Sequence, residues 1–370
     1  MQPPAAKRRW ALRLLAATLS MPLASIAGTH KHEGATASAA GNPYDRWTAQ
    51  AVATLSHRPD ADSLVTAAAL QPAFGPSGRQ TLQLLDRASR LAPSADDIVA
   101  LALLKCAEVA GCDAHRLARR LQALAPHNAL GWLPALNAAQ GHGQAPKVTR
   151  ILQRMSQASG FETYQASLAR RIQNGLADLP PPPDMDMHHH LDERHDRLLQ
   201  VRILVSLMPM PAYQPLIKAC RPDGADFAQR RSACREIGME LATSWSIIAN
   251  IIGVELQRWS AQGAHDCQQA LTRERDMDWL IPVRASCDRA HIAACLDADM
   301  QATSELDADR TIAHQLGKPL TPPATWLDRR LQASIRRGQL RFHSLACSDA
   351  AAKVLTSTPP EPGRIKKSPD

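Results

Sequence analysis

A run of histidines and carboxylates just past the middle of the chain is the stretch best suited to chemistry. It contains His188, His189, His190, Glu193 and His195. Imidazole and carboxylate groups are common ligands of Zn²⁺ and Cu²⁺. If a helix begins near His190, His189 and Glu193 share one face of it, so the stretch could hold a metal ion. The alternative is a solvated, histidine-rich linker, because no second histidine pair completes a recognisable site.

Catalytic motifs are absent from the sequence. It has no G-x-S-x-G elbow, no H-E-x-x-H motif and no phosphate-binding glycine loop. His265, Asp266 and Cys267 place a thiol beside a base, but a cysteine in an exported, cysteine-rich chain is usually half of a disulfide. We therefore expect no catalytic residue, and no cofactor other than the Zn²⁺ or Cu²⁺ considered above. An all-helical enzyme with a site assembled from distant residues stays open.

The first residues have the features of an export signal. Lys7, Arg8 and Arg9 are followed by the mainly apolar stretch 12–26, and a small-x-small pattern ends at Ala27. Removing residues 1–27 takes away four basic residues and no acidic one, so the formal charge falls from +8 to +4. A chain this mildly basic argues against nucleic acid as a partner. We expect a periplasmic or secreted protein.

Eight cysteines, an even number in an exported chain, predict disulfides rather than free thiols. In one helix Cys106 and Cys112 would lie about 9 Å apart, so a bridge requires a chain reversal near Gly111. Cys220 and Cys234 flank a turn sequence that could bring two helix ends together. The eight candidates are Cys106, Cys112, Cys220, Cys234, Cys267, Cys287, Cys295 and Cys347.

The pairing of the last four cysteines is less constrained. A single helix would hold Cys287 and Cys295 about 12 Å apart, which is too far for a disulfide. We therefore expect Cys267 and Cys347 to be the partners of these two. The spacing leaves open which joins which.

A proline-marked repeat organises the N-terminal half. Pro59, Pro93 and Pro126 each precede a stretch rich in alanine and leucine, at intervals of 34 and 33 residues. This period is the length of one helical hairpin, and a unit so small must stack on its neighbours to bury its apolar face. Period-2 stretches of β-branched residues are missing, so the composition predicts an all-α fold. Expected helices here include 98–109, 114–124, 129–140 and 147–158.

Residues 124–132 resemble the junction between two tetratricopeptide repeats, in which one repeat ends at Pro126 and the next opens with Trp132. Gly143 falls where that family turns between its two helices. The motifs are degenerate, since Val99 replaces the tryptophan at the previous junction and Pro134 interrupts a helix. The resemblance covers about residues 45–178 and implies stacked antiparallel hairpins in an α-solenoid.

Four consecutive prolines at 180–183 cannot continue a helix and favour an extended linker. After them we expect a second helical bundle containing disulfides, with helices at 191–208, 227–259, 264–284 and 288–316 and a last one opening at Thr321. Gly238 and Gly253 could bend or divide the longest of these. The expected organisation is a signal peptide (1–27), a flexible leader (28–43), a TPR-like repeat region (44–179), a Pro/His-rich linker (180–190), a C-terminal helical domain (191–356) and a disordered tail (357–370).

The architecture, rather than any motif, indicates the function. A stack of hairpins offers a continuous concave surface, so we expect non-catalytic binding of a protein or peptide partner in the cell envelope. The first alternative is a periplasmic metal-binding role for the cluster from His188 to His195, and the second is a cell-envelope enzyme. Five arginines of the last helix could meet anionic lipid, but basic terminal helices commonly serve solubility, and membrane contact is not expected. They are Arg329, Arg330, Arg336, Arg337 and Arg341.

Overall fold

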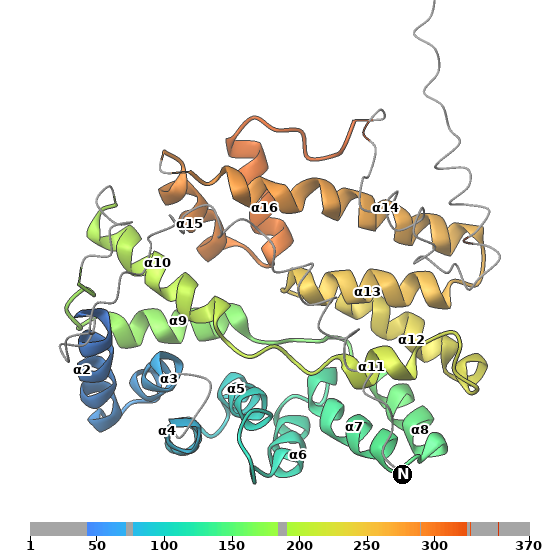
Figure 1. Cartoon of the computed structure of the whole chain (residues 1–370), viewed down its shortest axis with the longest axis horizontal. Coiled ribbons are helices and arrows are strands. Elements are labelled where there is room, and N and C mark those ends of the chain that lie inside the picture. Colours follow the sequence, from blue (N-terminus) through green and yellow to red (C-terminus); the bar gives the residue numbers. More distant parts are fainter. Residues whose placement is uncertain are drawn as a thin grey trace, which may run out of the picture. The chain divides into compact units, whose positions relative to one another are not determined.

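The computed structural model describes residues 43–71, 77–183, 191–288, 290–323, 326 and 347. Within these residues every regular element is a helix, and the only strand-like pairing is an isolated bridge between Asn128 and Gly160. The expected all-α fold is therefore confirmed (Figure 1). The expected signal peptide, leader, tail and basic last helix, together with His188, His189 and His190, lie outside the described residues.

Consecutive helices of the first half contact one another from α3 to α8. Asp60 and Asp113 cap two of them by accepting hydrogen bonds from Ser63 N and Arg116 N. The helix expected at 129–140 is divided, because Pro134 has no N–H to continue the ladder. The elements are α2 (Pro43–His57), α3 (Ala61–Leu70), α4 (Ser77–Leu91), α5 (Asp96–Cys106), α6 (Ala114–Leu124), η3 (Ala129–Trp132), α7 (Leu133–Gly141), α8 (Ala145–Ser156) and α9 (Gln165–Leu176).

The second half is also helical, with breaks that differ from those expected. The helix expected at 288–316 is two helices, and the long stretch 227–259 breaks at 242–246 rather than at its glycines. The elements are α10 (Glu193–Ser206), α11 (Gln214–Ala219), α12 (Phe227–Leu241), α13 (Ile247–Ser260), α14 (Ala264–Leu280), η4 (Ile281–Ser286), α15 (Ile292–Gln301) and α16 (Glu305–Gln315).

Gly238 and Gly253 serve the packing of α12 on α13. A Cβ at Gly238 would lie 2.9 Å from Gly253 O, and a Cβ at Gly253 would lie 2.6 Å from Gly238 O. Real Cβ atoms do not approach backbone so closely, so both positions require glycine for close helix contact. The two glycines therefore allow α12 and α13 to pack closely, and neither of them bends a single long helix.

The row of helices from α3 to α8 is covered by later parts of the chain. Helix α9 packs on α3 and α5, α11 packs on α7, and α12 packs on α8 (Figure 1). One apolar core joins α5–α8 to α11–α13, and another joins α2–α5 to α9 and α10. Helix α5 belongs to both cores, with all residues from Asp97 to Cys106 buried. The four prolines thus do not separate two cores, and Trp47 Nε1 donates to Pro180 O at 3.0 Å.

All eight cysteines are paired. Cys106 joins Cys112 with 5.5 Å between their Cα atoms, across a reversal in which Gly111 has a φ of 79°. Cys220 joins Cys234, also across a turn. Four bridges and no free thiol indicate an oxidising, extracytoplasmic environment. None of the described helices is long and apolar enough to cross a membrane.

The expectation that Cys287 and Cys295 take other partners is wrong. They bond to each other with 6.1 Å between their Cα atoms, and Cys267 bonds to Cys347. The expectation assumed one continuous helix. In the structure η4 ends at Ser286 and α15 begins at Ile292, so the intervening turn brings the two cysteines together.

Candidate functional site

The structure describes only part of the histidine cluster that could bind metal. Glu193 pairs with Arg197, at 3.1 Å. His195 Nδ1 lies 2.8 Å from Asp192 Oδ1, and its Nε2 lies 3.4 Å from Asp297 Oδ2. These two side chains are engaged in ion pairs and hydrogen bonds, and no group of three or more potential metal ligands occurs among the described residues.

Cys267 is not a thiol nucleophile. It is fully buried and bonded to Cys347. Its neighbour Asp266 pairs with Arg235 at 2.8 Å, and the His265 ring contacts Gln269 instead of the sulfur. These three residues therefore stabilise the start of α14 and hold no reactive group.

A small hollow on the surface has the character of a binding site. Its walls come from α5, from the approach to α9, from the loop between α10 and α11, and from the residue before α13. It has room for about one water-sized group, so it suits a single small side chain or a stretch of main chain rather than a metabolite. We call it the Tyr213 hollow, and it is lined by Leu104, Thr163, Gln165, Met208, Pro209, Met210, Pro211, Tyr213 and Ser246.

Two polar groups in this hollow are buried without a hydrogen-bond partner. They are the hydroxyl of Tyr213 and Oε1 of Gln165. Tyr213 as a whole residue is only 6% exposed. Burial, with the nearby Glu162 carboxylate adding to it, raises the pKa of Tyr213, so its hydroxyl stays protonated. Two of the residues that line the hollow therefore each carry an unpaired polar group, one a donor and one an acceptor. A buried polar group left unpaired costs about 1 to 3 kcal/mol, which a ligand that pairs with it would recover.

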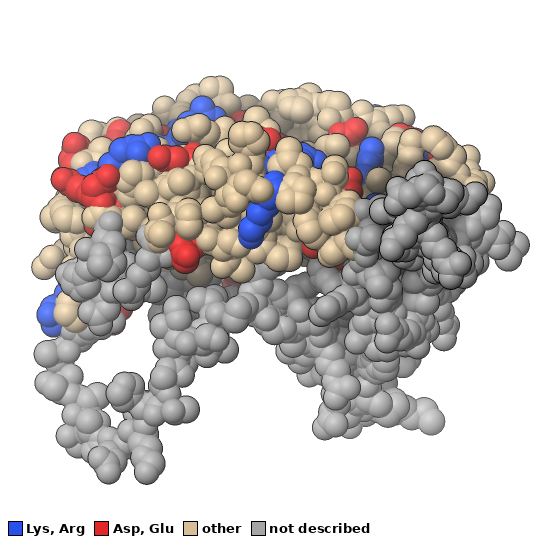
Figure 2. All heavy atoms as spheres, turned by 90° about the horizontal axis from the view of Figure 1, so that it is seen from above, with Lys and Arg blue, Asp and Glu red and all other residues tan. Residues whose placement is uncertain are grey.

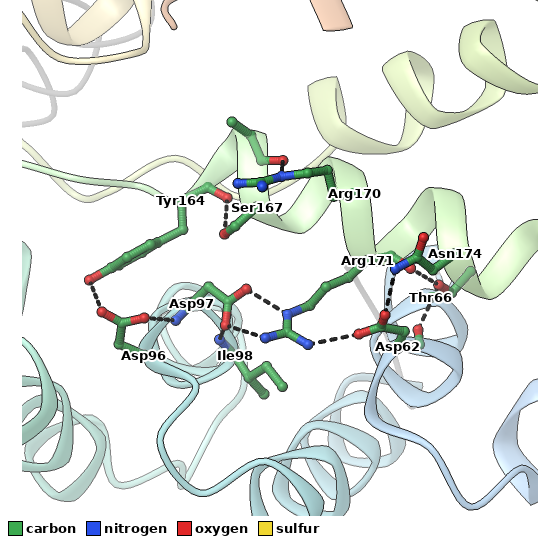
Figure 3. Close-up of polar contacts among 11 residues, drawn as sticks. Asp62, Thr66, Asp96, Asp97, Ile98, Tyr164, Ser167, Arg170, Arg171 and Asn174 are labelled. Carbon is green, nitrogen blue, oxygen red and sulfur yellow. Dashed lines mark hydrogen bonds and ion pairs between the residues drawn. The ribbon is translucent and has the colours of Figure 1, made fainter. Parts of the chain in front are cut away.

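The wall containing Gln165 is fixed by a left-handed residue. Tyr164 has a φ of 60°, the only non-glycine residue with positive φ among those described. Its hydroxyl donates to Asp96 Oδ2 at 2.8 Å, at the start of α5 (Figure 3). Thr163 and Gln165, on either side of it, both line the hollow. Backbone strain of this kind is often found where a site must hold its shape.

An arginine anchors α9 beside this turn. Arg171 donates from Nε to Asp97 Oδ2 at 2.6 Å and from Nη2 to Asp97 Oδ1 at 3.1 Å, while Nη1 donates to Asp62 Oδ1 at 2.7 Å (Figure 3). Asn174 adds a bond to Asp62 Oδ2 at 2.8 Å. One guanidinium thus ties α9 to the first turns of both α3 and α5. This fixes the helix whose first residue is Gln165.

Two further contacts position the remaining walls. The Asn128 side chain caps η3 by accepting a hydrogen bond from Leu130 N, and it also exchanges hydrogen bonds with the backbone of Glu162. Phe161 packs against the ring of Tyr213, with 5.5 Å between the ring centroids. The side chain of Asn128 therefore holds the segment that carries both Phe161 and Thr163.

The lining of the hollow contains no charged residue, and the Glu162 carboxylate lies near Tyr213 outside it. The described residues include five large exposed hydrophobic side chains, and three of them lie in or beside the hollow walls: Leu207 at 68% exposure, Met210 at 47% and Ile248 at 37%. On the face drawn in Figure 2, the described Lys and Arg residues are interspersed with Asp and Glu, and neither sign forms a continuous patch.

Sequence reasoning missed the Tyr213 hollow. The signal available was the segment Met208-Pro209-Met210-Pro211, where apolar residues alternate with prolines that cannot be helical. Tyr213 follows this segment after Ala212. The opposite wall, from Thr163 to Gln165, carries no signal of its own, because its position depends on the contacts of Tyr164 and Asn128.

Comparison of the chain with protein-family models, curated proteins and solved structures finds no match. The site must therefore be interpreted from its own residues.

Proposed function

We propose that this protein is an exported, non-catalytic binding protein that holds an extended peptide segment of a cell-envelope partner in the Tyr213 hollow. Signal-peptide cleavage near Ala27 delivers it to the periplasm or the exterior. Stacked hairpins like those of tetratricopeptide repeats serve as its scaffold. In this proposal the ligand does not lie along a concave groove, because α9, α11 and α12 pack against α3, α7 and α8.

The unpaired groups of the hollow carry the proposal. A peptide group has a carbonyl that accepts from the Tyr213 hydroxyl and an N–H that donates to Gln165 Oε1, so one residue of main chain satisfies both. The exposed Leu207, Met210 and Ile248 supply apolar contacts for side chains on either side. Methionine adapts its shape to varied partners, as expected of a surface that accepts several sequences.

Charge and size argue against other ligands. An anion would face the Glu162 carboxylate, whose field already raises the pKa of Tyr213. A cation would find no carboxylate in the lining to replace its hydration shell, because Glu162 lies outside the lining. A metabolite needs a larger cavity than one with room for about one water-sized group. A neutral, extended chain fits these constraints best.

Replacing Tyr213 by phenylalanine should affect binding and stability in opposite ways. The change removes a buried hydroxyl that has no partner, so the free energy of unfolding should stay equal or rise slightly. Affinity for a peptide selected from a random display library against the mature protein should fall about tenfold, since one hydrogen bond is lost. Fluorescence polarisation of the labelled peptide and urea denaturation measure the two effects.

Tyr44→Phe is the matched control, because Tyr44 lies at the start of α2, outside the hollow lining. It should leave peptide affinity unchanged. Methylating each amide nitrogen of the selected peptide in turn should abolish binding at one position, the one that donates to Gln165. A display selection that yields no peptide, or a peptide indifferent to both Tyr213→Phe and N-methylation, would contradict the proposal.

A further inference from the structure

A partly buried ion network connects four helical elements near the hollow. Arg202 of α10 pairs with Asp299 of α15 at 3.2 Å and with Glu305 of α16 at 3.5 Å. Arg284 of η4 pairs with Asp299 at 2.7 Å and with Asp309 of α16 at 2.5 Å. Three carboxylates therefore face two guanidinium groups. With every group ionised, the network carries one excess negative charge.

Glu305 connects this network to a wall of the Tyr213 hollow. Its Oε2 accepts from Ile247 N at 2.8 Å, and its own N donates to Trp245 O at 2.8 Å. Ser246, which lines the hollow, lies between these two residues. The start of α16 thus holds the segment Trp245–Ile247 from both sides. Movement of α16 would release this wall.

Asp309 is the carboxylate of the network whose ionised form is least stabilised by its surroundings. It is fully buried, and neither of its oxygens accepts a well-directed hydrogen bond within the described structure. Burial raises its pKa to about 7, with Asp299 and Glu305 also raising it and Arg284 and Arg202 opposing them. One proton on Asp309 leaves two negative charges facing two positive ones. The network is then balanced.

The α15–α16 hairpin is built so that it can shift without opening the main cores. It has a small core of its own with η4 and the end of α14, separate from the two large ones. Its contacts with α10 are largely ionic, since Arg194 pairs with Asp297 at 2.7 Å beside the Arg202 pairs, and only Met300 packs against the large core. Loosening this hairpin therefore exposes little apolar surface.

We propose that protonation of the network controls the hollow: the balanced network docks α16 and holds the wall at Ser246, and its excess negative charge loosens both. The sign follows from linkage. The docked state binds the Asp309 proton more tightly than the undocked state, so docking weakens as the pH rises from the ordinary aspartate pKa of 3.8 to the docked pKa of about 7, and it does not change further above that. Peptide affinity should then fall as the pH rises from about 4 to 7, a consequence that rests on the proposed function.

His195 titrates with the same sign and must be separated from Asp309. Its hydrogen bonds to Asp192 and Asp297 raise its pKa, so this link between α10 and α15 loses its charge as the pH rises. Arg194 also faces Asp297. His195 contacts neither Glu305 nor the wall of the hollow. Its replacement by glutamine therefore serves as the control variant.

Hydrogen–deuterium exchange of the mature, oxidised protein without peptide tests the inference. Exchange at the amides of 246–250, corrected for intrinsic rates, should increase about tenfold for each pH unit between about 5 and 7 and level off above 7, as one linked proton requires. Asp309→Asn should remove this dependence, and His195→Gln should keep it. A wild-type protein with constant corrected exchange between about pH 5 and pH 7 would overturn the inference, even if Asp309→Asn failed to fold.

The peptide experiment has a separate outcome. If the exchange depends on pH as expected but no peptide binds, control of the wall at Ser246 by protonation stands and the proposed function fails. If peptide binds with an affinity that does not change between about pH 5 and pH 7, the proposed function stands and control of the hollow by protonation fails. A pH dependence lost in His195→Gln and kept in Asp309→Asn would also overturn the inference, because the α10–α15 contact would then carry it.

Discussion

Replacing Arg171 by methionine should lower the free energy of unfolding by about 3 to 5 kcal/mol, the usual cost of breaking a buried ion pair. Methionine keeps the length of the side chain but leaves Asp62 and Asp97 without their cation. The Asp97 side chain is only 5% exposed, so water cannot replace the lost hydrogen bonds. Urea denaturation of the oxidised protein at pH 7 measures the change.

Arg170→Met is the matched control for this variant. Arg170 is exposed and bonds only to a carbonyl of its own helix, so the free energy of unfolding should change by no more than about 0.5 kcal/mol. Equal losses in the two variants would show that the network in Figure 3 does not stabilise the fold.

Gly253→Ala should destabilise the protein by about 3 kcal/mol, at the upper end of the effect of adding atoms to a packed core. The added methyl group would meet the backbone of α12 at Gly238 and Ala242. Backbone atoms cannot move away by a rotamer change as a flexible side chain can, so α12 and α13 must move apart along their contact. Thermal unfolding followed by circular dichroism, with the disulfides intact, measures the loss.

Gly141→Ala provides the comparison, because a Cβ at this helical position meets nothing within 4 Å. Alanine has the higher helix propensity, so this change should be neutral or should stabilise the protein by up to about 1 kcal/mol. If Gly253→Ala proved as harmless as Gly141→Ala, the close approach of α12 and α13 would be wrong.

Local patterns predicted the helices well, because capping and periodicity act over a few residues. The helix 114–124, with Asp113 as its cap, is an example. The expectation for Cys287 and Cys295 was wrong because it extended a local helical pattern across both residues. The non-helical turn between them leaves only a weak signal in the sequence. Gly238 was interpreted as a bend because its real constraint, the backbone of α13, lies across a helix contact that sequence spacing does not reveal.

The candidate site was harder to predict because its parts meet only through tertiary contacts. Asp96 and Asp97 lie at the start of α5, but their partners Tyr164 and Arg171 lie 68 and 74 residues away along the chain. Nothing in a single sequence connects such positions. The Tyr213 hydroxyl is notable only because it lacks a partner, which is a property of the folded surroundings and not of the residue.

The disulfide arrangement has a consequence for how the chain matures. Three bridges close short loops, with separations of 6, 14 and 8 residues, whereas Cys267–Cys347 spans 80 residues and encloses Cys287–Cys295. Oxidation in order of emergence would join Cys267 to Cys287. Cys267 must instead stay reduced until Cys347 arrives, or exchange out of that wrong bond by thiolate attack. Maturation of this chain therefore requires either delayed oxidation of Cys267 or a disulfide-isomerising activity in its compartment.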